Sequence, residues 1–139
     1  MIFAIKYIPY IWAKFDEAYK HGKIKTLADI SRDSAIVLTD KEMKYNFSPV
    51  PDKQSGNYVL LKIRNLNDYP FDVIMNYGKD EKKNGSFTFT VAREQKFREY
   101  LIRVSSQYNW MNNDNNWLTM MPVGGGNIEV RAVKILKGD

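Results

Sequence analysis

Alternation of apolar and polar residues with a period of two runs through most of the chain after residue 35. It is clearest in "SFTFTVA" (86–92), where Phe87, Phe89 and Val91 alternate with serine and threonine. Successive side chains of a β-strand point to opposite faces, so this period predicts a strand with one buried face. A helix would need apolar residues three or four positions apart. Most of the chain is therefore restricted to β-structure.

Eight segments are predicted as strands on this basis. They are residues 35–39, 41–47, 57–66, 71–78, 86–92, 99–106, 117–123 and 127–136, of which the first two could also form one bent strand. Turn residues separate them, among them the charged stretch 79–85, which ends in Asn84-Gly85, a pair that tolerates positive φ. Short strands at this spacing predict a mainly β fold, an antiparallel two-sheet β-sandwich of the jelly-roll type.

The beginning of the chain follows a different pattern. Ile8, Trp12, Phe15 and Tyr19 recur at helical spacing, and Gly22 is well placed to end a helix. The next stretch, "KIKTLADIS", fits a short extended or helical connector. We expect this one amphipathic helix to pack against its own domain. Otherwise it would dock on a membrane surface, or on a larger enzyme domain if the chain is one piece of a longer polypeptide.

A chain of 139 residues suits a single globular unit. Its expected parts are the N-terminal helix and connector over 1–34 and the β-sandwich domain over 35–139. The opening "MIFAIKYIPYIWAKF" is interrupted by Lys6 and Pro9, and it falls short of the ~20 apolar residues of a transmembrane helix. It also lacks the pattern of a secretory signal, which favours a cytoplasmic location. The absence of cysteine fits that location, although many secreted domains also lack disulfides.

Composition offers little support for catalysis. Without cysteine, thiolate chemistry and cysteine zinc sites are excluded, and His21 is the single histidine. Carboxylate pairs such as Glu94 with Glu99, or Asp40 with Glu42, arise by accident in any fold. The triple glycine lacks the lysine that follows in a phosphate-binding loop. We therefore expect a protein that is not an enzyme.

The net charge of +5 would permit binding to a polyanion. Lysine and arginine are mixed with acidic residues, however, as in "KDEKK" and "REQKFRE". Nucleic-acid binders usually concentrate positive charge on one face. Polyanion binding stays the weaker hypothesis, and it predicts a steep salt dependence.

The chemistry of a ligand site is concentrated in "SSQYNWMNNDNNWLTMMPVGGG" (105–126). Sugars present an apolar C–H face and a set of hydroxyl groups. Proteins bind the first with aromatic rings and the second with amide, carboxylate or guanidinium groups. This stretch and the strand before it supply both. The predicted ligand-binding residues are Arg103, Tyr108, Trp110, Asn112, Asn113, Asn115, Asn116 and Trp117.

The final part of the sequence, "EYLIRVSSQYNWMNNDNNWLTMMPVGGGNIEVRAVKILKGD", resembles the closing strands of galactose-binding-like carbohydrate-binding modules. The similarity covers residues 57–139 and lies in strands of the types "YLIRVSS" and "IEVRAVKIL" with an aromatic loop between them. No motif aligns residue by residue, so no ligand residues are carried over. The resemblance implies a non-catalytic, sugar-binding accessory domain of a polysaccharide-processing protein.

Modules of that kind often hold a structural calcium ion, and this chain has carboxylates near several predicted strand ends. Calcium needs six to eight oxygen ligands, including backbone carbonyls. No other cofactor is expected. The candidate carboxylates are Asp40, Asp52, Asp72, Asp114 and Asp139.

Two hypotheses from different classes follow. A glycan-binding sandwich predicts that Trp110 is exposed to solvent beside convergent amides. A structural or protein–protein interaction sandwich, which would bind through the N-terminal helix or a sheet edge, predicts that Trp110 and Trp117 are buried. Asparagine clusters also occur in ordinary turns, because their side chains hydrogen-bond nearby backbone.

Overall fold

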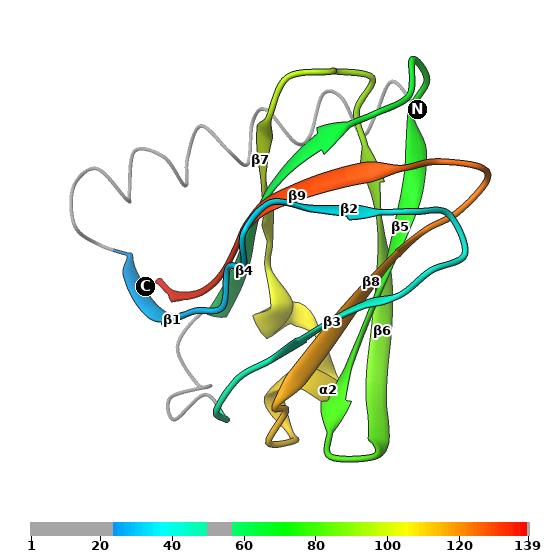
Figure 1. Ribbon diagram of the computed structural model, residues 1–139. Helices are drawn as coiled ribbons and strands as arrows, with labels where there is room; N and C mark the ends of the chain where they lie inside the picture. Colours follow the sequence, from blue (N-terminus) through cyan, green and yellow to red (C-terminus); the bar gives the residue numbers. More distant parts are fainter. Residues whose placement is uncertain (1–23, 50–56, 139) are drawn as a thin grey trace.

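The computed structural model describes residues 24–49 and 57–138, which form two antiparallel sheets packed face to face (Figure 1). Sheet A contains β1 (Lys25–Asp29), β2 (Ala35–Val37), β9 (Ile128–Lys137), β4 (Asn57–Asn65) and β7 (Arg98–Ile102), with β1 and β2 both paired to β9. Sheet B contains β3 (Met43–Asn46), β8 (Trp117–Pro122), β5 (Phe71–Lys79) and β6 (Lys82–Val91), in that spatial order.

The chain crosses between the sheets at almost every connection. From β2 to β9, successive strands lie in alternate sheets except at the β5–β6 hairpin, and the first and last of these strands are neighbours in sheet A. This is the strand order of a jelly roll. The predicted sandwich is therefore confirmed.

One strand lies outside the eight predicted segments. The connector "KIKTLADIS" is extended, and its β1 pairs with the end of β9 through Thr26↔Leu136. The sheets thus begin before residue 35. The predicted N-terminal helix lies outside the described residues, and within those residues the structure has no helix long and apolar enough to cross a membrane.

The faces predicted to be buried do form the core. On β4 the alternating residues Val59, Leu61 and Ile63 are buried, as are Met75 and Tyr77 on β5. Burying an aliphatic side chain of this size contributes about 1.5–3 kcal/mol. The period of two is therefore what places each strand in the sandwich.

The β5–β6 turn lies earlier than predicted. The two strands stay paired as far as Lys79↔Lys82, so the turn is formed by Asp80 and Glu81, with Asp80 at φ 53°. Gly85 lies inside β6, where a Cβ atom would come within 2.6 Å of the Tyr77 hydroxyl oxygen. The glycine is needed for a close approach and not for a turn.

The segment predicted as a strand over 99–106 ends at Ile102 in β7. A 3₁₀ turn, η1 (Val104–Ser106), and a four-residue helix, α2 (Tyr108–Met111), follow it. Val104 is fully buried at the start of the turn. The chain therefore bends inward at a point where the alternating pattern predicted that it would continue straight.

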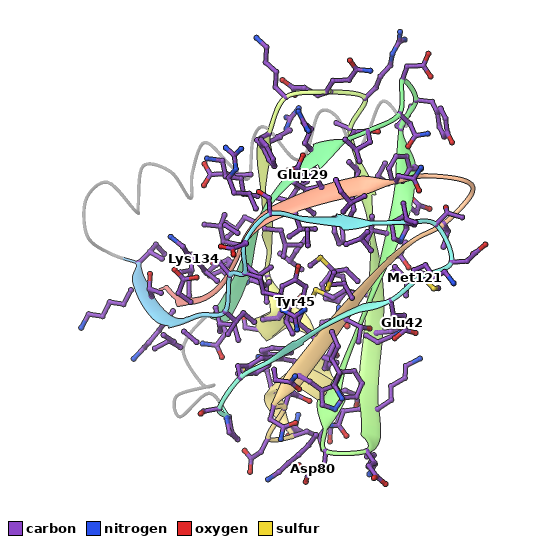
Figure 2. All side chains as sticks on the ribbon, in the orientation of Figure 1. Glu42, Tyr45, Asp80, Met121, Glu129 and Lys134 are labelled. Carbon is purple, nitrogen blue, oxygen red and sulfur yellow. The ribbon has the colours of Figure 1, made fainter. Side chains whose placement is uncertain are left out.

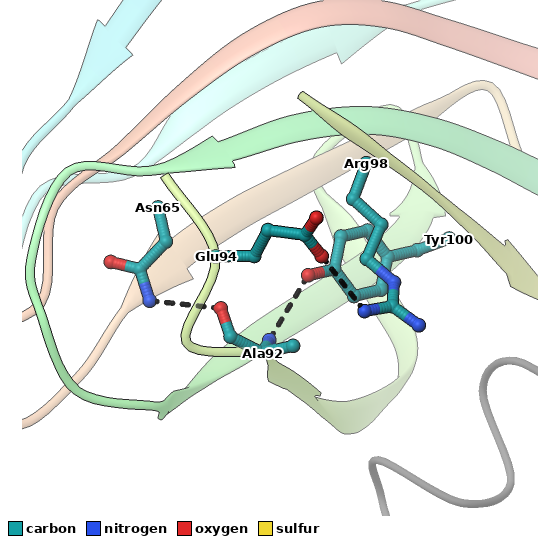
Figure 3. Close-up of polar contacts among 5 residues, drawn as sticks. All are labelled: Asn65, Ala92, Glu94, Arg98 and Tyr100. Carbon is teal, nitrogen blue, oxygen red and sulfur yellow. Dashed lines mark hydrogen bonds and ion pairs between the residues drawn. The ribbon is translucent and has the colours of Figure 1, made fainter. Parts of the chain in front are cut away.

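The end of β6 is fastened by buried polar side chains, shown in Figure 3. The Asn65 amide donates to the carbonyls of Ala92 and Tyr69, at 3.1 and 2.9 Å, and its own oxygen accepts from the Asn67 N–H at 2.7 Å. The Tyr100 hydroxyl accepts from the Ala92 N–H at 3.0 Å. We call this the Ala92 corner, defined by Asn65, Ala92 and Tyr100.

Candidate functional site

A polar pocket opens between the tip of the β5–β6 hairpin and the asparagine-rich loop that follows α2. Its volume is about 520 Å³. Asp80, labelled in Figure 2, marks the hairpin side. The residues that line it are Lys79, Asp80, Glu81, Lys82, Asn84, Asn113 and Asp114.

Hydrogen bonds fix the loop against the hairpin. The Asn116 side chain accepts from the Asp80 N–H at 3.0 Å and donates to the Asp80 carboxylate at 3.1 Å. The Asn84 amide donates to the Asn115 side-chain oxygen at 2.8 Å, and the Asn115 amide donates to the Trp110 carbonyl at 3.1 Å. The walls of the pocket are therefore held in place from both sides.

Trp110 does not line this pocket. Its side chain is 1% exposed and lies in the core, with its ring at an edge-to-face angle to Tyr77 and stacked near Phe47, at centroid distances of 5.2 and 6.1 Å. Burial also raises the pKa of the Tyr77 hydroxyl beside it. The exposure of Trp110 that the glycan-binding hypothesis requires is not found, because α2 turns the indole inward. In this position it has no free face for a sugar.

Trp117 is also largely covered, with 9% of its surface exposed. Its indole N–H donates to the Asp80 carbonyl at 2.8 Å, which ties β8 to the hairpin tip. Tyr108, by contrast, is 77% exposed at the start of α2. The two predicted tryptophans thus serve packing and hairpin anchoring, and the exposed aromatic side chain of this region is the tyrosine.

The other predicted residues are divided between the pocket and its surroundings. Asn113 lines the pocket and donates to the Asn109 carbonyl at 2.8 Å. Asn112 is exposed and caps α2 by donating to the Tyr108 carbonyl at 2.9 Å. Arg103 is exposed next to η1. Of the eight predicted residues, the structure places only Asn113 in the wall of the pocket itself.

The pocket walls carry both charges, three carboxylates and two ammonium groups, together with two amides. Such groups donate to and accept from hydroxyls. In the described parts of the chain there is no cluster of three or more acidic, histidine or cysteine side chains suited to a metal ion. Calcium binding stays a prediction, since two of its candidate residues, Asp52 and Asp139, lie outside the described ranges.

The sequence reasoning missed all five hairpin residues that line the pocket, which are Lys79, Asp80, Glu81, Lys82 and Asn84. "KDEKK" was predicted as part of a charged hairpin turn of mixed sign, and its residues are exposed in the structure. Two sequence features could have pointed to the pocket: a charged hairpin and an asparagine-rich loop more than thirty residues later. No local pattern shows that Asp80 and Asn116 meet; only the β5–β8 pairing brings them together.

Comparisons with known proteins place the chain by its fold. No family model and no curated protein sequence matches it. PfGH50B is similar at a TM-score of 0.54 with 6% identity, over 84% of this chain and 22% of that one. Latent aurone synthase (polyphenol oxidase) from a natural source has a TM-score of 0.49 and 15% identity, covering 82% of this chain and 28% of that one.

Carbohydrate-binding modules are also among the similar structures. The CBM36-1 domain of a multidomain xylanase from the hindgut metagenome of Trinervitermes trinervoides is 13% identical, with a TM-score of 0.47 over 81% of this chain and 94% of that one. At such identities the likeness concerns the fold alone, and one fold hosts many functions.

Proposed function

We propose that this protein is a non-catalytic carbohydrate-binding domain whose hairpin–loop pocket takes a sugar. The observation that carries the proposal is a polar pocket of about 520 Å³. Its hairpin wall has ammonium, carboxylate and amide groups, and its loop wall has an amide and a carboxylate. Such groups match a ring of hydroxyls, which need both donors and acceptors. The volume also lies in the usual range for small-ligand sites.

The hydrogen bonds behind the pocket support the same function. Asn115 is 3% exposed and joins the loop to both Asn84 and the Trp110 carbonyl. A binding site that is ordered before the ligand arrives avoids part of the entropic cost of binding. The asparagines predicted as direct ligands would thus act mainly behind the site, and Asn113 would act at its surface.

The sugar-binding proposal extends to an accessory role in a larger, polysaccharide-processing protein. The sequence resemblance supports this extension. A domain in this role would bring a partner catalytic domain to a polymer without taking part in the reaction.

The test is a glycan array, followed by calorimetric titration of each sugar that binds. Glu81→Ala and Asp114→Ala each remove a carboxylate from the pocket wall. A hydrogen bond to a charged group contributes about 1.5–3 kcal/mol, so we expect each change to weaken binding about tenfold or more.

Asp68→Ala is the matched control, because it removes an exposed carboxylate from the β4–β5 turn, at the other end of β5 from the hairpin. Its affinity should equal that of the unaltered protein. If the array finds no sugar that binds, or if the pocket variants bind as the control does, the proposed function is wrong.

A protein-interaction role is the second candidate, because both tryptophans are buried as that hypothesis predicted. Its surface would be the β2 edge, where Ile36 and Leu38 are 51% and 50% exposed. Unpaired strand edges bind other strands readily. Sedimentation over a range of concentrations tests for self-association through this edge, which Ile36→Lys should abolish.

A further inference from the structure

The outer face of sheet B carries a second group of side chains suited to a ligand. On β8, Leu118 and Met120 point into the core, so Trp117 and Thr119 point outward. On the neighbouring strands, Lys44 and Asn76 lie on the same outer face, each opposite Thr119. We call these four residues the Trp117 surface, defined by Lys44, Asn76, Trp117 and Thr119.

Lys44 covers the ring of Trp117. Its ammonium nitrogen lies 5.0 Å from the ring centroid, a cation–π contact, and the lysine itself is exposed. Gly78 on the adjacent strand makes room for the indole, because a Cβ atom there would lie 2.6 Å from the ring atom Cζ2. The aromatic ring thus lies against the sheet and is covered by an exposed lysine side chain.

Two polar atoms on the same face of sheet B have no partner among the described residues. The Thr119 hydroxyl and the Asn76 side-chain oxygen are buried, and neither has a hydrogen-bond partner among the described residues. Thr119 as a whole is 4% exposed. Buried polar atoms in proteins are usually paired, so two neighbouring exceptions on one surface are suited to an external partner. By contrast, Thr90 on the same face donates to the Asp72 carboxylate at 2.8 Å.

We propose that the Trp117 surface is a second saccharide site and that Lys44 makes it selective for acidic sugars. This proposal rests on the carbohydrate-binding function proposed above. Lys44 leaves the ring and pairs with the carboxylate of a uronic acid residue. The uncovered indole then packs against the C–H face of the sugar, while Thr119 and Asn76 bind its hydroxyls.

The selectivity depends on whether the sugar replaces the cation–π contact that Lys44 loses when it leaves the ring. A neutral sugar displaces the lysine and provides no charged partner for its ammonium group. An acidic sugar gives the ammonium group a carboxylate partner. An exposed ion pair of this kind is screened by salt, so the preference for the acidic sugar decreases as ionic strength rises.

The test compares oligogalacturonate with a cello-oligosaccharide of equal length by calorimetric titration. Lys44→Ala should weaken oligogalacturonate binding about fivefold and remove its salt dependence. Binding of the neutral sugar should stay the same or become tighter, because the ring is uncovered. Lys134→Ala, which removes the same charge from β9 in sheet A, is the control and should leave both affinities unchanged (Figure 2).

Thr119→Val provides the second variant, since valine keeps the shape and removes only the hydroxyl. Binding of oligogalacturonate should weaken while the melting temperature stays the same or rises. A purely structural threonine would give the opposite result, a lower melting temperature with unchanged binding. That result, or equal affinities of the Lys44→Ala and Lys134→Ala variants for the acidic sugar, would overturn the proposal.

The two proposals fail in different ways. If no saccharide binds at all, both are wrong. If Glu81→Ala weakens binding while Lys44→Ala and Thr119→Val do not, the pocket is the site and the Trp117 surface is not. If the Trp117 surface variants weaken binding of the acidic sugar while the pocket variants leave all binding unchanged, the second site stands and the pocket does not.

Discussion

The Ala92 corner and the Trp117 surface both contain a buried asparagine amide and a hydroxyl group, but they differ in how these groups are paired. At the corner, Asn65 makes three hydrogen bonds to the backbone, and Tyr100 accepts one (Figure 3). On the Trp117 surface, the oxygens of Asn76 and Thr119 have no partner within the described residues.

The difference separates polar groups that stabilise the fold from polar groups that have no partner within the described residues. A paired buried group contributes to stability, and removing its partner leaves an orphan that costs about 1–3 kcal/mol. An unpaired buried group already destabilises the folded state. The corner should therefore be sensitive to mutation, whereas the Trp117 surface should be tolerant of it.

Alkaline pH is expected to produce the largest effect. Burial raises the pKa of Tyr100 above the ordinary value of 10.0, and burial does the same for Tyr45 and Tyr77. Because these hydroxyls have a higher pKa in the folded state than in the unfolded state, their contribution to the free energy of unfolding is fully present below pH 10. It is lost as the pH rises through the pKa values of the folded state. Chemical denaturation at several pH values, with tyrosinate absorbance, should show unfolding and ionisation occurring together. Ionisation of all tyrosines in a folded protein would contradict this.

Asn65→Leu should have the next largest effect. It leaves the Ala92 and Tyr69 carbonyls and the Asn67 N–H without their buried partner, and we expect a loss of about 3 kcal/mol in the free energy of unfolding. Denaturation in urea measures it. Asn67→Ala is a suitable comparison, because that residue is less buried. If both variants lose the same free energy of unfolding, the Ala92 corner is no more important for stability than Asn67.

Tyr100→Phe should destabilise less, by about 1–2 kcal/mol, because only the Ala92 N–H loses a partner and the ring remains. The same variant should lose less of its stability as pH rises above 10, since one buried hydroxyl no longer ionises. An unchanged dependence of stability on pH would show that Tyr45 or Tyr77 controls it.

Thr119→Val should have the smallest effect, and one of opposite sign: a gain of up to about 1 kcal/mol, because an unpaired hydroxyl is removed. Thr90→Val, on the same face, removes a hydroxyl that is bonded to Asp72 and should lower stability slightly. If both variants lose stability equally, the Thr119 hydroxyl has a partner in solution, and the contrast with the corner disappears.

Strand patterning predicted the fold because the side-chain period is a local property. Val59, Leu61 and Ile63 lie in the core as the alternation required. The same rule failed at Val104, where the apolar residue is buried in a 3₁₀ turn. Burial of Val104 satisfies the pattern in either geometry, so the pattern could not distinguish a strand from a bend.

The candidate site could be predicted only in part. The asparagine-rich loop does border the pocket, through Asn113, but Trp110 faces the core. An aromatic residue beside asparagines has the same local sequence whether it faces a sugar or the interior. Which of these holds is decided by α2, a helix of four residues that is too short for periodicity to reveal.

By itself, the sequence determined the β class, the two stacked sheets and the inward face of most strands, because alternation and turn residues act over a few neighbouring positions. Only the tertiary structure decided that Asp80 meets Asn116, that Lys44 covers Trp117, and that the buried Thr119 hydroxyl has no partner in the described part of the chain. The first two relations join strands or loops distant in the chain, and the pairing of sheet B fixes all three. Local preferences carry no information about such pairings.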